Sequence, residues 1–483
     1  MIVGIQNEIL KIHSLGLLKK LLEDKTTRAN IIWATDAYKD RGIKYERDQE
    51  IKVDLVIGIN SDVIKNRARK EMEHQAERTR QHAEVFTPLW ICKMMNECTD
   101  EGWFIEGEHP FQKQSIIKFR DDRTWQKYVD SRLLEITCGE APYLVSRYDV
   151  SNGESIPVPE RIGILDRKLR VVSENTQTED EWMEWTTRAF QSTYGYEFQG
   201  DNVLIARVNL LMTFEEYMED RWKRKPSLKE YQSIANIISW NIWQMDGLTE
   251  TIPYCKAEEE SHQMTMFEFL NMETDDSKEK NEQPLCEIYN WRSGYRFKFC
   301  AMKERSTGTM KFDFIIGNPP YISYADLDLE TRVYIKDKFS SCKEGKPDYY
   351  YAFIEQSLNF LNETGVLAYL IPNNIFKNRF GERIRNIMKD SLMEVIDYDN
   401  LKMFEGKLTT SSVIICSKAK KKRSIVYKNI PNELTYKIQK NNLNEKWIFN
   451  TDIEHMEREH VFGDEFNVFM SVATLLNKAF VIS

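Results

Sequence analysis

From about residue 130 onward, the sequence alternates short apolar runs with longer segments of helical periodicity. The predicted strands span 132–137, 161–166, 194–199, 242–247, 312–318, 366–372, 393–399 and 411–418. Helices are predicted between them, for instance over 201–220, 227–239 and 349–362. This alternation is typical of a mostly parallel sheet that is covered by helices on both faces. We therefore expect an α/β fold.

An open α/β sheet binds its ligands beyond the carboxyl ends of its strands, so residues that follow predicted strands are candidates for a site. In "LLEITCGEAPYL" (133–144), Glu135 ends a strand and a Cys138-Gly139 turn leads into a helix. Glycine lets the backbone approach a ligand, and a helix N-terminus offers free N–H groups. The pattern is not GxGxxG, because Glu140 and Ala141 stand where other nucleotide sites have glycine. The missing glycine and the acidic side chain argue against a pyrophosphate and favour a cofactor with an ammonium group. The alternative is an ordinary strand–turn–helix connection.

Two further carboxylates follow predicted strands. Glu197 in "YGYEFQ" is placed to accept from both hydroxyls of a ribose, unless it faces solvent. Its separation from Glu135 exceeds the ~20 residues usual between such elements, which indicates an insertion over about 150–190. Asp246 in "IWQMDGL" could accept from an exocyclic amine, or it could simply form an Asp-Gly turn.

The stretch "FDFIIGNPPYI" (312–322) is a predicted buried strand that ends in Asn318-Pro319-Pro320-Tyr321. Proline lacks an N–H and pushes the preceding residue into an extended conformation, so the two prolines fix the backbone after Asn318. The Asn318 side-chain oxygen and the Pro319 carbonyl oxygen can then face one spot, which suits a single –NH2 group. Tyr321 offers an aromatic face for a heterocycle. The alternative is a rigid loop without chemistry.

Two other segments are candidates only in combination with the rest. In "HAEVFTPLWICKMM" (82–95), Phe86-Thr87-Pro88 precedes a helix, with Thr87 as the expected N-cap and Pro88 in the first turn. Phe404 lies in a predicted loop before a buried strand. It is either a core aromatic or the second wall of an aromatic sandwich with Tyr321.

With these residues in view, the chain resembles the adenine-N6 DNA methyltransferases of restriction–modification systems. It is most similar to the gamma class and to the modification halves of type IIG-like enzymes, over about residues 80 to 420. The motifs follow the gamma-class order: Phe86-Thr87-Pro88, the 135–143 turn, Glu197, Asp246, Asn318-Pro319-Pro320-Tyr321, "DYYYAF" (348–353), "GVLAYLIPNNIF" (365–376) and Phe404. One departure is Ala141, where the family has a small residue or glycine.

The resemblance implies a Rossmann-like S-adenosylmethionine-dependent methyltransferase fold with a seven-stranded, mostly parallel sheet. The implied cofactor is S-adenosyl-L-methionine, and no metal is implied. Its methionine part would be held by Phe86, Thr87, Glu135, Thr137, Cys138 and Gly139, its ribose by Glu197 and its adenine amine by Asp246. Asn318 and Pro319 would orient the target amine on the mount that Pro320 stiffens, and Tyr321 and Phe404 would stack on the extruded base.

The implied reaction is site-specific transfer of a methyl group to the N6 amine of a flipped adenine in double-stranded DNA. Flipping is needed because the amine is paired inside the duplex. The transfer would be direct and in line, without a covalent enzyme intermediate. Cytosine-N4 in DNA, or a glutamine side chain in a protein, is an alternative target for the same motif. A further alternative is a subunit that binds cofactor but needs a partner for DNA recognition.

The expected organisation has three parts: a mainly helical N-terminal extension over 1–80, a catalytic domain over 81–430 with an acidic loop at 256–285, and a shortened start of a target recognition domain over 431–483. The short third part makes a cognate restriction or specificity subunit an expected partner. The eight cysteines are scattered without a CxxC pair, and no apolar run reaches the length of a membrane span. We therefore expect a cytoplasmic protein of a bacterium or archaeon.

Overall fold

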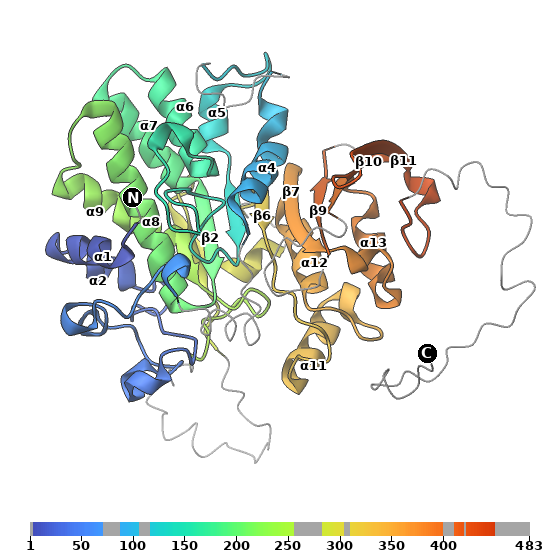
Figure 1. Cartoon of the computed structure of the whole chain (residues 1–483), viewed down its shortest axis with the longest axis horizontal. Helices are drawn as coiled ribbons and strands as arrows, with labels where there is room; N and C mark the ends of the chain where they lie inside the picture. The colour runs from blue at the N-terminus through green and yellow to red at the C-terminus, as the bar shows by residue number, and fades with distance from the viewer. Residues whose placement is uncertain are drawn as a thin grey trace, which may run out of the picture. The chain divides into compact units, whose positions relative to one another are not determined.

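A nine-stranded sheet with the order β11-β10-β8-β9-β7-β6-β1-β2-β3 forms the centre of the molecule (Figure 1). The structure is a computed structural model, and it describes residues 3–70, 87–105, 116–255, 283–303, 310–398, 410–419 and 422–449. The strands are β1 (Leu133–Ile136), β2 (Thr193–Glu197), β3 (Ile242–Gln244), β6 (Phe312–Gly317), β7 (Leu361–Pro372), β8 (Leu392–Asp397), β9 (Ser411–Ser417), β10 (Ser424–Asn429) and β11 (Leu434–Gln439).

The sheet is mainly parallel, which confirms the predicted α/β fold. Strand β1 pairs in parallel with β2 on one side and with β6 on the other. Strand β9 is antiparallel to both β7 and β8. The expected number of seven strands is wrong, because β10 pairs with β8 and β11 extends the same edge.

Alternate residues of the central strands face opposite sides, and both sides are buried. Phe314 and Ile316 of β6 belong to the large core cluster, whereas Ile315 between them is equally buried on the other face. Helix α4 (Leu89–Asp100) packs on β6 and β7 from one side. On the opposite face, the Tyr369 hydroxyl of β7 bonds Ser357 of α12 (Tyr350–Phe360). Burial on both faces explains why these strands read as continuous apolar runs.

The remaining described α-helices after α4 lie before and between the strands in chain order. They are α5 (Trp125–Asp130), α6 (Ile164–Asn175), α7 (Glu179–Gln191), α8 (Gly200–Trp222), α9 (Leu228–Asn241), α11 (Leu329–Lys338) and α13 (Glu382–Lys389). Helices α8 and α9 pack on β2 and β3. The region expected as an insertion, about 150–190, contains α6 and most of α7.

The strand predicted at 161–166 is wrong, because α6 begins at Ile164. Ile164, Leu165, Leu169 and Val172 are buried at helical spacing. A Cβ atom on Gly163 would lie 2.3 Å from the Leu144 carbonyl oxygen, so glycine allows the close approach at which the helix starts.

The N-terminal segment contains less helix than the sequence suggested. Helices α1 (Ile5–Ser14) and α2 (Leu18–Leu22) are followed by isolated bridges and short 3-10 turns. The run 51–60 contains the 3-10 turns Val53–Leu55 and Gly58–Asn60. The segment also is not a separate body, since Met1–Trp447 form one compact unit.

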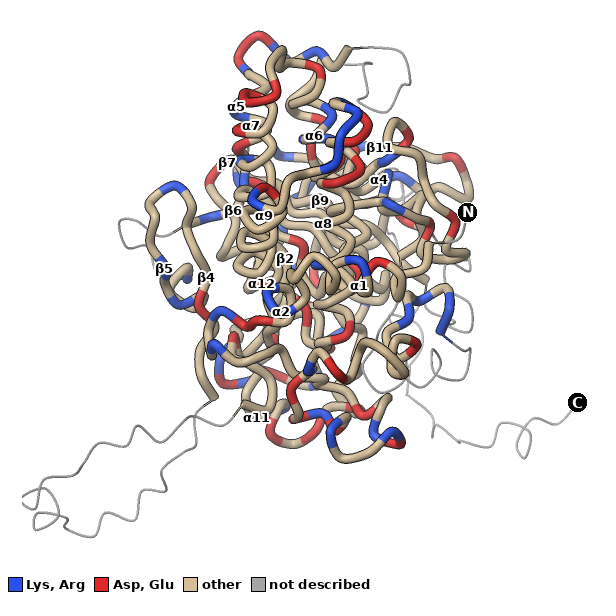
Figure 2. Tube along the Cα trace, turned by 90° about the vertical axis from the view of Figure 1, so that its left-hand side faces the viewer, with Lys and Arg blue, Asp and Glu red and all other residues tan. Residues whose placement is uncertain are grey.

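The expected boundary at residue 430 and the expected acidic loop can also be compared with the structure. The boundary expected at residue 430 falls between the paired strands β10 and β11. Most of the acidic loop, 256–282, lies outside the described residues. A short hairpin of β4 (Glu287–Asn290) and β5 (Tyr295–Lys298) follows it, with several Lys and Arg positions along it (Figure 2), of which Arg292, Arg296 and Lys298 are exposed. Within the described ranges, no helix has the length and apolar character that a membrane crossing requires.

Candidate active site

A cavity of about 1170 Å³ lies at the carboxyl ends of β1, β2, β3 and β6. Most residues singled out in the sequence line it: Thr87, Glu135, Thr137, Cys138, Gly139, Glu197, Asp246, Asn318 and Pro320. Pro319 and Tyr321 are neighbours that do not line this cavity. Phe86 and Phe404 lie outside the described residues. The parallel sheet therefore gathers at one edge side chains that are far apart in the sequence.

The turn after β1 has an unusual backbone. Thr137, Gly139 and Ala141 all have positive φ angles, of 43°, 53° and 65°. Such angles are easy for glycine and cost about 1–3 kcal/mol for other residues when the surroundings enforce them. Ala141 thus occupies a conformation that glycine would adopt without strain. The Thr137 hydroxyl donates to the Asn318 backbone carbonyl at 3.2 Å, which joins this turn to the end of β6.

Glu135 is the penultimate residue of β1, and its side chain is 1% exposed. Its Oε2 accepts from the Leu144 backbone N–H at 3.1 Å. Burial raises the pKa of this carboxyl well above its usual value, the Tyr143 and Leu144 N–H groups oppose that rise, and Glu197 adds to it. A positively charged group in the cavity would favour its ionised form.

Glu197 joins two turns of the cavity wall. Its Oε2 accepts from the Gly139 N–H at 2.9 Å, and its Oε1 accepts from the Gln199 N–H at 3.1 Å. A carboxylate has about four lone-pair sites, so each oxygen can also accept from a hydroxyl. The solvent-facing alternative for Glu197 is wrong, because the side chain is buried and lines the cavity.

Asp246 follows β3. It forms the predicted turn, and it also lines the cavity where an acceptor for an amine was predicted. Its Oδ1 accepts from the N–H groups of Leu248 and Thr249 at 3.0 and 3.1 Å, which is an Asx turn. The residue nevertheless lines the cavity. The turn fixes the carboxylate, and its Oδ2 can accept from an amine.

Thr87 has a different role from the N-cap that the sequence suggested. The N-cap of α4 is Pro88, and Thr87 makes no cap hydrogen bond. Its buried Oγ1 instead accepts from the Asn318 Nδ2 at 3.3 Å and from the Tyr143 hydroxyl at 3.2 Å. This assignment of the amide places the Asn318 Oδ1 on the branch away from Thr87.

Tyr321 is held from two sides. Its hydroxyl donates to the Leu370 carbonyl of β7 at 2.8 Å, and its ring meets Tyr350 edge to face at 6.0 Å. Burial raises the pKa of the Tyr321 hydroxyl, so it stays protonated as a donor. These two contacts therefore fix the ring of Tyr321, three residues after Asn318 in the sequence.

Residues 191–404, which include β2, β3, β6 and the Asn318 segment, match the family model described as Eco57I restriction-modification methylase. The type II methyltransferase M.BstVI of Geobacillus stearothermophilus is 29% identical over 124 residues. The chain contains a restriction–modification methylase domain.

The matches cover only part of each relative. The M.BstVI alignment spans 25% of this chain and 22% of that protein. The type II restriction enzyme and methyltransferase RM.Eco57I of Escherichia coli is 29% identical over 114 residues, 22% of this chain and 11% of that protein. A solved type I restriction-modification methyltransferase subunit from Streptococcus thermophilus is 14% identical with a TM-score of 0.35, covering 71% of this chain and 46% of that one.

The cofactor of such a methylase domain is S-adenosyl-L-methionine, and the cavity of this chain fits it chemically. Glu135, Glu197 and Asp246 supply carboxylate oxygens along one wall, which suit an ammonium group, a ribose diol and an adenine amine. The volume is also ample for a ligand of this size. Among the described residues, no group of three or more His, Cys, Asp or Glu is arranged to hold a metal ion.

Sequence reasoning assigned no individual role to several residues of the candidate site, although Tyr143 and Tyr349 lie within the quoted motifs 133–144 and 348–353. Tyr143 carries the hydroxyl that bonds Thr87, and Phe198, Leu248, Tyr254 and Tyr349 also line the cavity. Phe198 directly follows Glu197 and meets Tyr254 edge to face at 5.9 Å. Its place after a strand end was a usable signal. Tyr254 had none, since it comes eight residues after Asp246.

Proposed function

We propose that the protein transfers a methyl group from S-adenosyl-L-methionine to the exocyclic N6 amine of a flipped adenine in double-stranded DNA. The observation that carries the proposal is the position of Asn318. Its amide is oriented by Thr87 at the wall of the cavity that contains Glu135, Glu197 and Asp246. A planar amide acceptor thus lies beside a set of carboxylates that suits the cofactor.

In this proposal, the carboxylates divide the cofactor between them. Glu135 and the turn of Thr137, Cys138 and Gly139 hold the methionine end together with Thr87. Glu197 accepts from the ribose hydroxyls, and Asp246 accepts from the adenine amine. When bound, the cofactor supplies an electrophilic methyl group on a sulfonium.

The chain's own residues would act on the target amine. The Asn318 Oδ1 and the Pro319 carbonyl accept its two N–H groups, which favours a pyramidal nitrogen with an available lone pair. The nitrogen forms its bond to the methyl carbon as the carbon–sulfur bond breaks, and one proton then leaves the nitrogen for solvent. Catalysis is by positioning and electrostatics.

Tyr321 offers the aromatic face for the flipped base, next to the acceptors. Its hydroxyl bond to Leu370 fixes the ring, so the base can stack without ordering a mobile side chain. Flipping costs a few kcal/mol of lost pairing and stacking, which such contacts offset.

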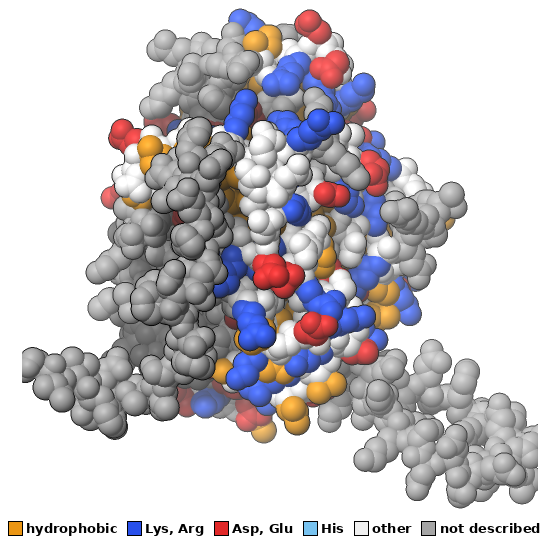
Figure 3. All heavy atoms as spheres, turned by 90° about the vertical axis from the view of Figure 1, so that its right-hand side faces the viewer, with side chains coloured by type: hydrophobic (Ala, Val, Ile, Leu, Met, Phe, Trp, Pro, Cys, Tyr) orange, Lys and Arg blue, Asp and Glu red, His pale blue; other side chains and the backbone are white. Residues whose placement is uncertain are grey.

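The face that includes α11, α13 and the β10–β11 edge would contact the DNA backbone. These elements lie on the right of Figure 1, the side that Figure 3 presents, where Lys and Arg side chains are interspersed with Asp and Glu. The exposed cations include Lys338, Lys343, Lys377, Arg379 and Arg383. Lys338 also lines the cavity. Cations near the cavity suit phosphate contacts that position a duplex without reading its sequence.

Transfer of tritium from labelled cofactor to DNA, followed by nucleoside analysis, tests the proposal. We expect label in N6-methyladenine. Label in N4-methylcytosine would replace adenine by cytosine as the target, and label in protein would overturn DNA as the substrate. The assay is run with and without a co-expressed restriction or specificity subunit, because the partner of this chain is also a proposal. Activity only with that subunit would support the partner-dependent form.

A further inference from the structure

Glu140 lies in the cofactor turn, between Gly139 and Ala141, yet it is not among the residues that line the cavity. Its carboxylate is buried and accepts two hydrogen bonds. The Arg67 backbone N–H donates to Oε1 at 2.6 Å, and the Tyr148 hydroxyl donates to Oε2 at 2.7 Å. The side chain of Glu140 therefore forms hydrogen bonds with Arg67 and Tyr148 instead of facing the cavity.

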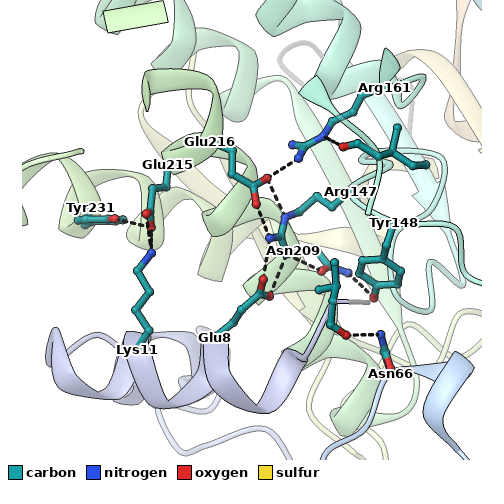
Figure 4. Close-up of polar contacts among 12 residues, drawn as sticks. Glu8, Lys11, Asn66, Arg147, Tyr148, Arg161, Asn209, Glu215, Glu216 and Tyr231 are labelled. Atoms are coloured by element: carbon teal, nitrogen blue, oxygen red, sulfur yellow. Dashed lines mark hydrogen bonds and ion pairs between the residues drawn. The ribbon is translucent and has the colours of Figure 1, made fainter. Parts of the chain in front are cut away.

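A chain of polar groups continues from Glu140 to the half-buried Glu8 of helix α1, and Figure 4 shows its part from Tyr148 through Asn209 and Arg147 to Glu8. Asn209 of α8 donates to the Tyr148 hydroxyl at 3.1 Å and to the Glu140 carbonyl at 3.0 Å. Arg147 donates to the Asn209 Oδ1 at 3.3 Å. The Arg147 guanidinium also makes a bidentate pair with Glu8 of α1, at 2.9 and 2.7 Å.

The same N-terminal segment contacts the two other strand ends of the cofactor wall. Beyond β2, the Asp201 Oδ2 accepts from the Tyr38 hydroxyl at 2.7 Å and from Lys70 at 3.3 Å. At the end of β3, the Gln244 side chain pairs with the N–H and carbonyl of Ile32, both at 2.9 Å. Residues of the segment 3–70 therefore contact the chain within five residues of each proposed cofactor-binding carboxylate, at Glu140, Asp201 and Gln244.

We propose that Glu140, Tyr148 and Asn209 are positioning residues for the cofactor, through which the N-terminal segment sets the shape of the turn after β1. The proposal rests on the proposed function. The turn has positive φ angles on both sides of Glu140, and its Gly139 N–H donates to Glu197. A conformation that costs energy persists only when its surroundings enforce it. Here the enforcing contacts are the bonds of Glu140.

The test compares two substitutions that each delete one tyrosine hydroxyl. Tyr148→Phe removes the donor to Glu140. Tyr231→Phe removes a hydroxyl that donates to Glu215, also at 2.7 Å. Glu215 lies on α8, the helix that also carries Asn209, but away from Tyr148 (Figure 4). Tyr148→Phe also removes the acceptor of the Asn209 Nδ2 bond, so its fall in melting temperature should be the larger of the two, with both falls within about 1–3 °C.

Cofactor binding separates the two variants. Direct titration of the full chain with S-adenosyl-L-methionine should show a Kd raised about tenfold by Tyr148→Phe and by less than twofold for Tyr231→Phe, a tenfold change being about 1.4 kcal/mol. At saturating cofactor, the methyl transfer rate of Tyr148→Phe should stay within twofold of the wild type. Equal Kd values for both variants would overturn the positioning role.

A second substitution guards against a folding defect. Glu140→Gln keeps the shape and one acceptor, and it should raise the Kd less than Glu140→Ala does. Identical Kd values for Glu140→Gln, Glu140→Ala and the wild type would also overturn the proposal. Binding is measured without DNA, so failure of the proposed function appears separately: a wild type that binds cofactor but does not methylate adenine leaves the positioning role intact.

Discussion

The amide nitrogen of Asn318 lies 3.3 Å from the hydroxyl oxygen of Thr87, and this hydrogen bond joins segments 231 residues apart. The Tyr143 hydroxyl donates to the same oxygen, so both donors depend on one threonine. The orientation of the proposed acceptor is therefore set by the segment before α4 and by the turn region after β1.

Thr87→Val tests this orientation. Valine keeps the shape but removes the acceptor, so the Asn318 amide loses the hydrogen bond that its Nδ2 makes to Thr87 and is oriented less strictly. We expect the methyl transfer rate to fall about tenfold or more, since misplacement of a group at the reacting atom is costly. Rates are measured at saturating cofactor and DNA.

Thr99→Val is the matched control, because Thr99 is a buried threonine of α4, the helix that follows Thr87, and its hydroxyl donates to the Met95 carbonyl. It should lose stability but keep the transfer rate within about twofold. Equal losses of rate in both variants would remove the special role of Thr87.

Glu197→Gln should weaken cofactor binding. Its carboxylate accepts from the Gly139 and Gln199 N–H groups, and a glutamine would place an NH2 group against one of these donors. Leaving a buried donor without an acceptor costs about 1–3 kcal/mol, so the Kd for S-adenosyl-L-methionine should rise about tenfold or more. Glu215→Gln, on a buried carboxylate of α8, should leave that Kd unchanged.

Lys168 should make stability depend on pH. Its Nζ is buried and donates to the Ser131 carbonyl and the Ser192 hydroxyl, and burial lowers its pKa to about 7. Between pH 7 and about 10 the unfolded chain keeps this proton and the folded chain releases it. The unfolded state then binds more protons, so this group's contribution raises the unfolding free energy as pH rises, by at most about 1.4 kcal/mol per pH unit.

Lys168→Met removes that contribution. Urea unfolding at pH 7, 8 and 9 should show the wild type gaining stability relative to the variant over this window. Parallel pH profiles would mean that Lys168 keeps an ordinary pKa in the folded protein.

Gly200→Ala should separate the N-terminal segment from α8. A Cβ atom at Gly200 would lie 1.9 Å from the Ile32 carbonyl oxygen, so the backbone has to move. Overpacking of this kind costs typically about 1–3 kcal/mol, read as a lower urea midpoint. Gly102→Ala is the control, since nothing lies within 4 Å of its added atom, and its midpoint should not change.

The sequence predicted the central strands well because of where they lie. Strands β1 and β6 and the second half of β7 are mostly buried on both faces, so their residues form mainly apolar runs, interrupted by Glu135 and Asp313, that can be recognised without knowing which strands pair. Strands β10 and β11 at the sheet edge were not predicted, because only every second residue of β10 is buried and β11 is mostly exposed, with Ile438 as its buried residue. At 161–166, an apolar run of strand length began a helix, and periodicity over so short a stretch does not distinguish the two.

For the candidate site, the rule that ligand-binding residues lie at the carboxyl ends of the strands predicted Glu135, Glu197 and Asp246, and all three line one cavity. The rule does not give side-chain directions. Glu140 stands beside Gly139 in the sequence but bonds to Arg67 and Tyr148. Threonine is a common N-cap residue, yet the Thr87 hydroxyl accepts a hydrogen bond from the Asn318 amide, and no local sequence pattern could indicate this contact.

The central claim is that Asn318 acts on the target amine rather than on the cofactor. Asn318→Ala in the full chain tests it most directly, with cofactor titration and tritium transfer to DNA measured on the same preparation. We predict that transfer to adenine is abolished while the Kd for S-adenosyl-L-methionine stays within about threefold of the wild type, because the carboxylates of the cavity are untouched. Full turnover by Asn318→Ala would contradict the account.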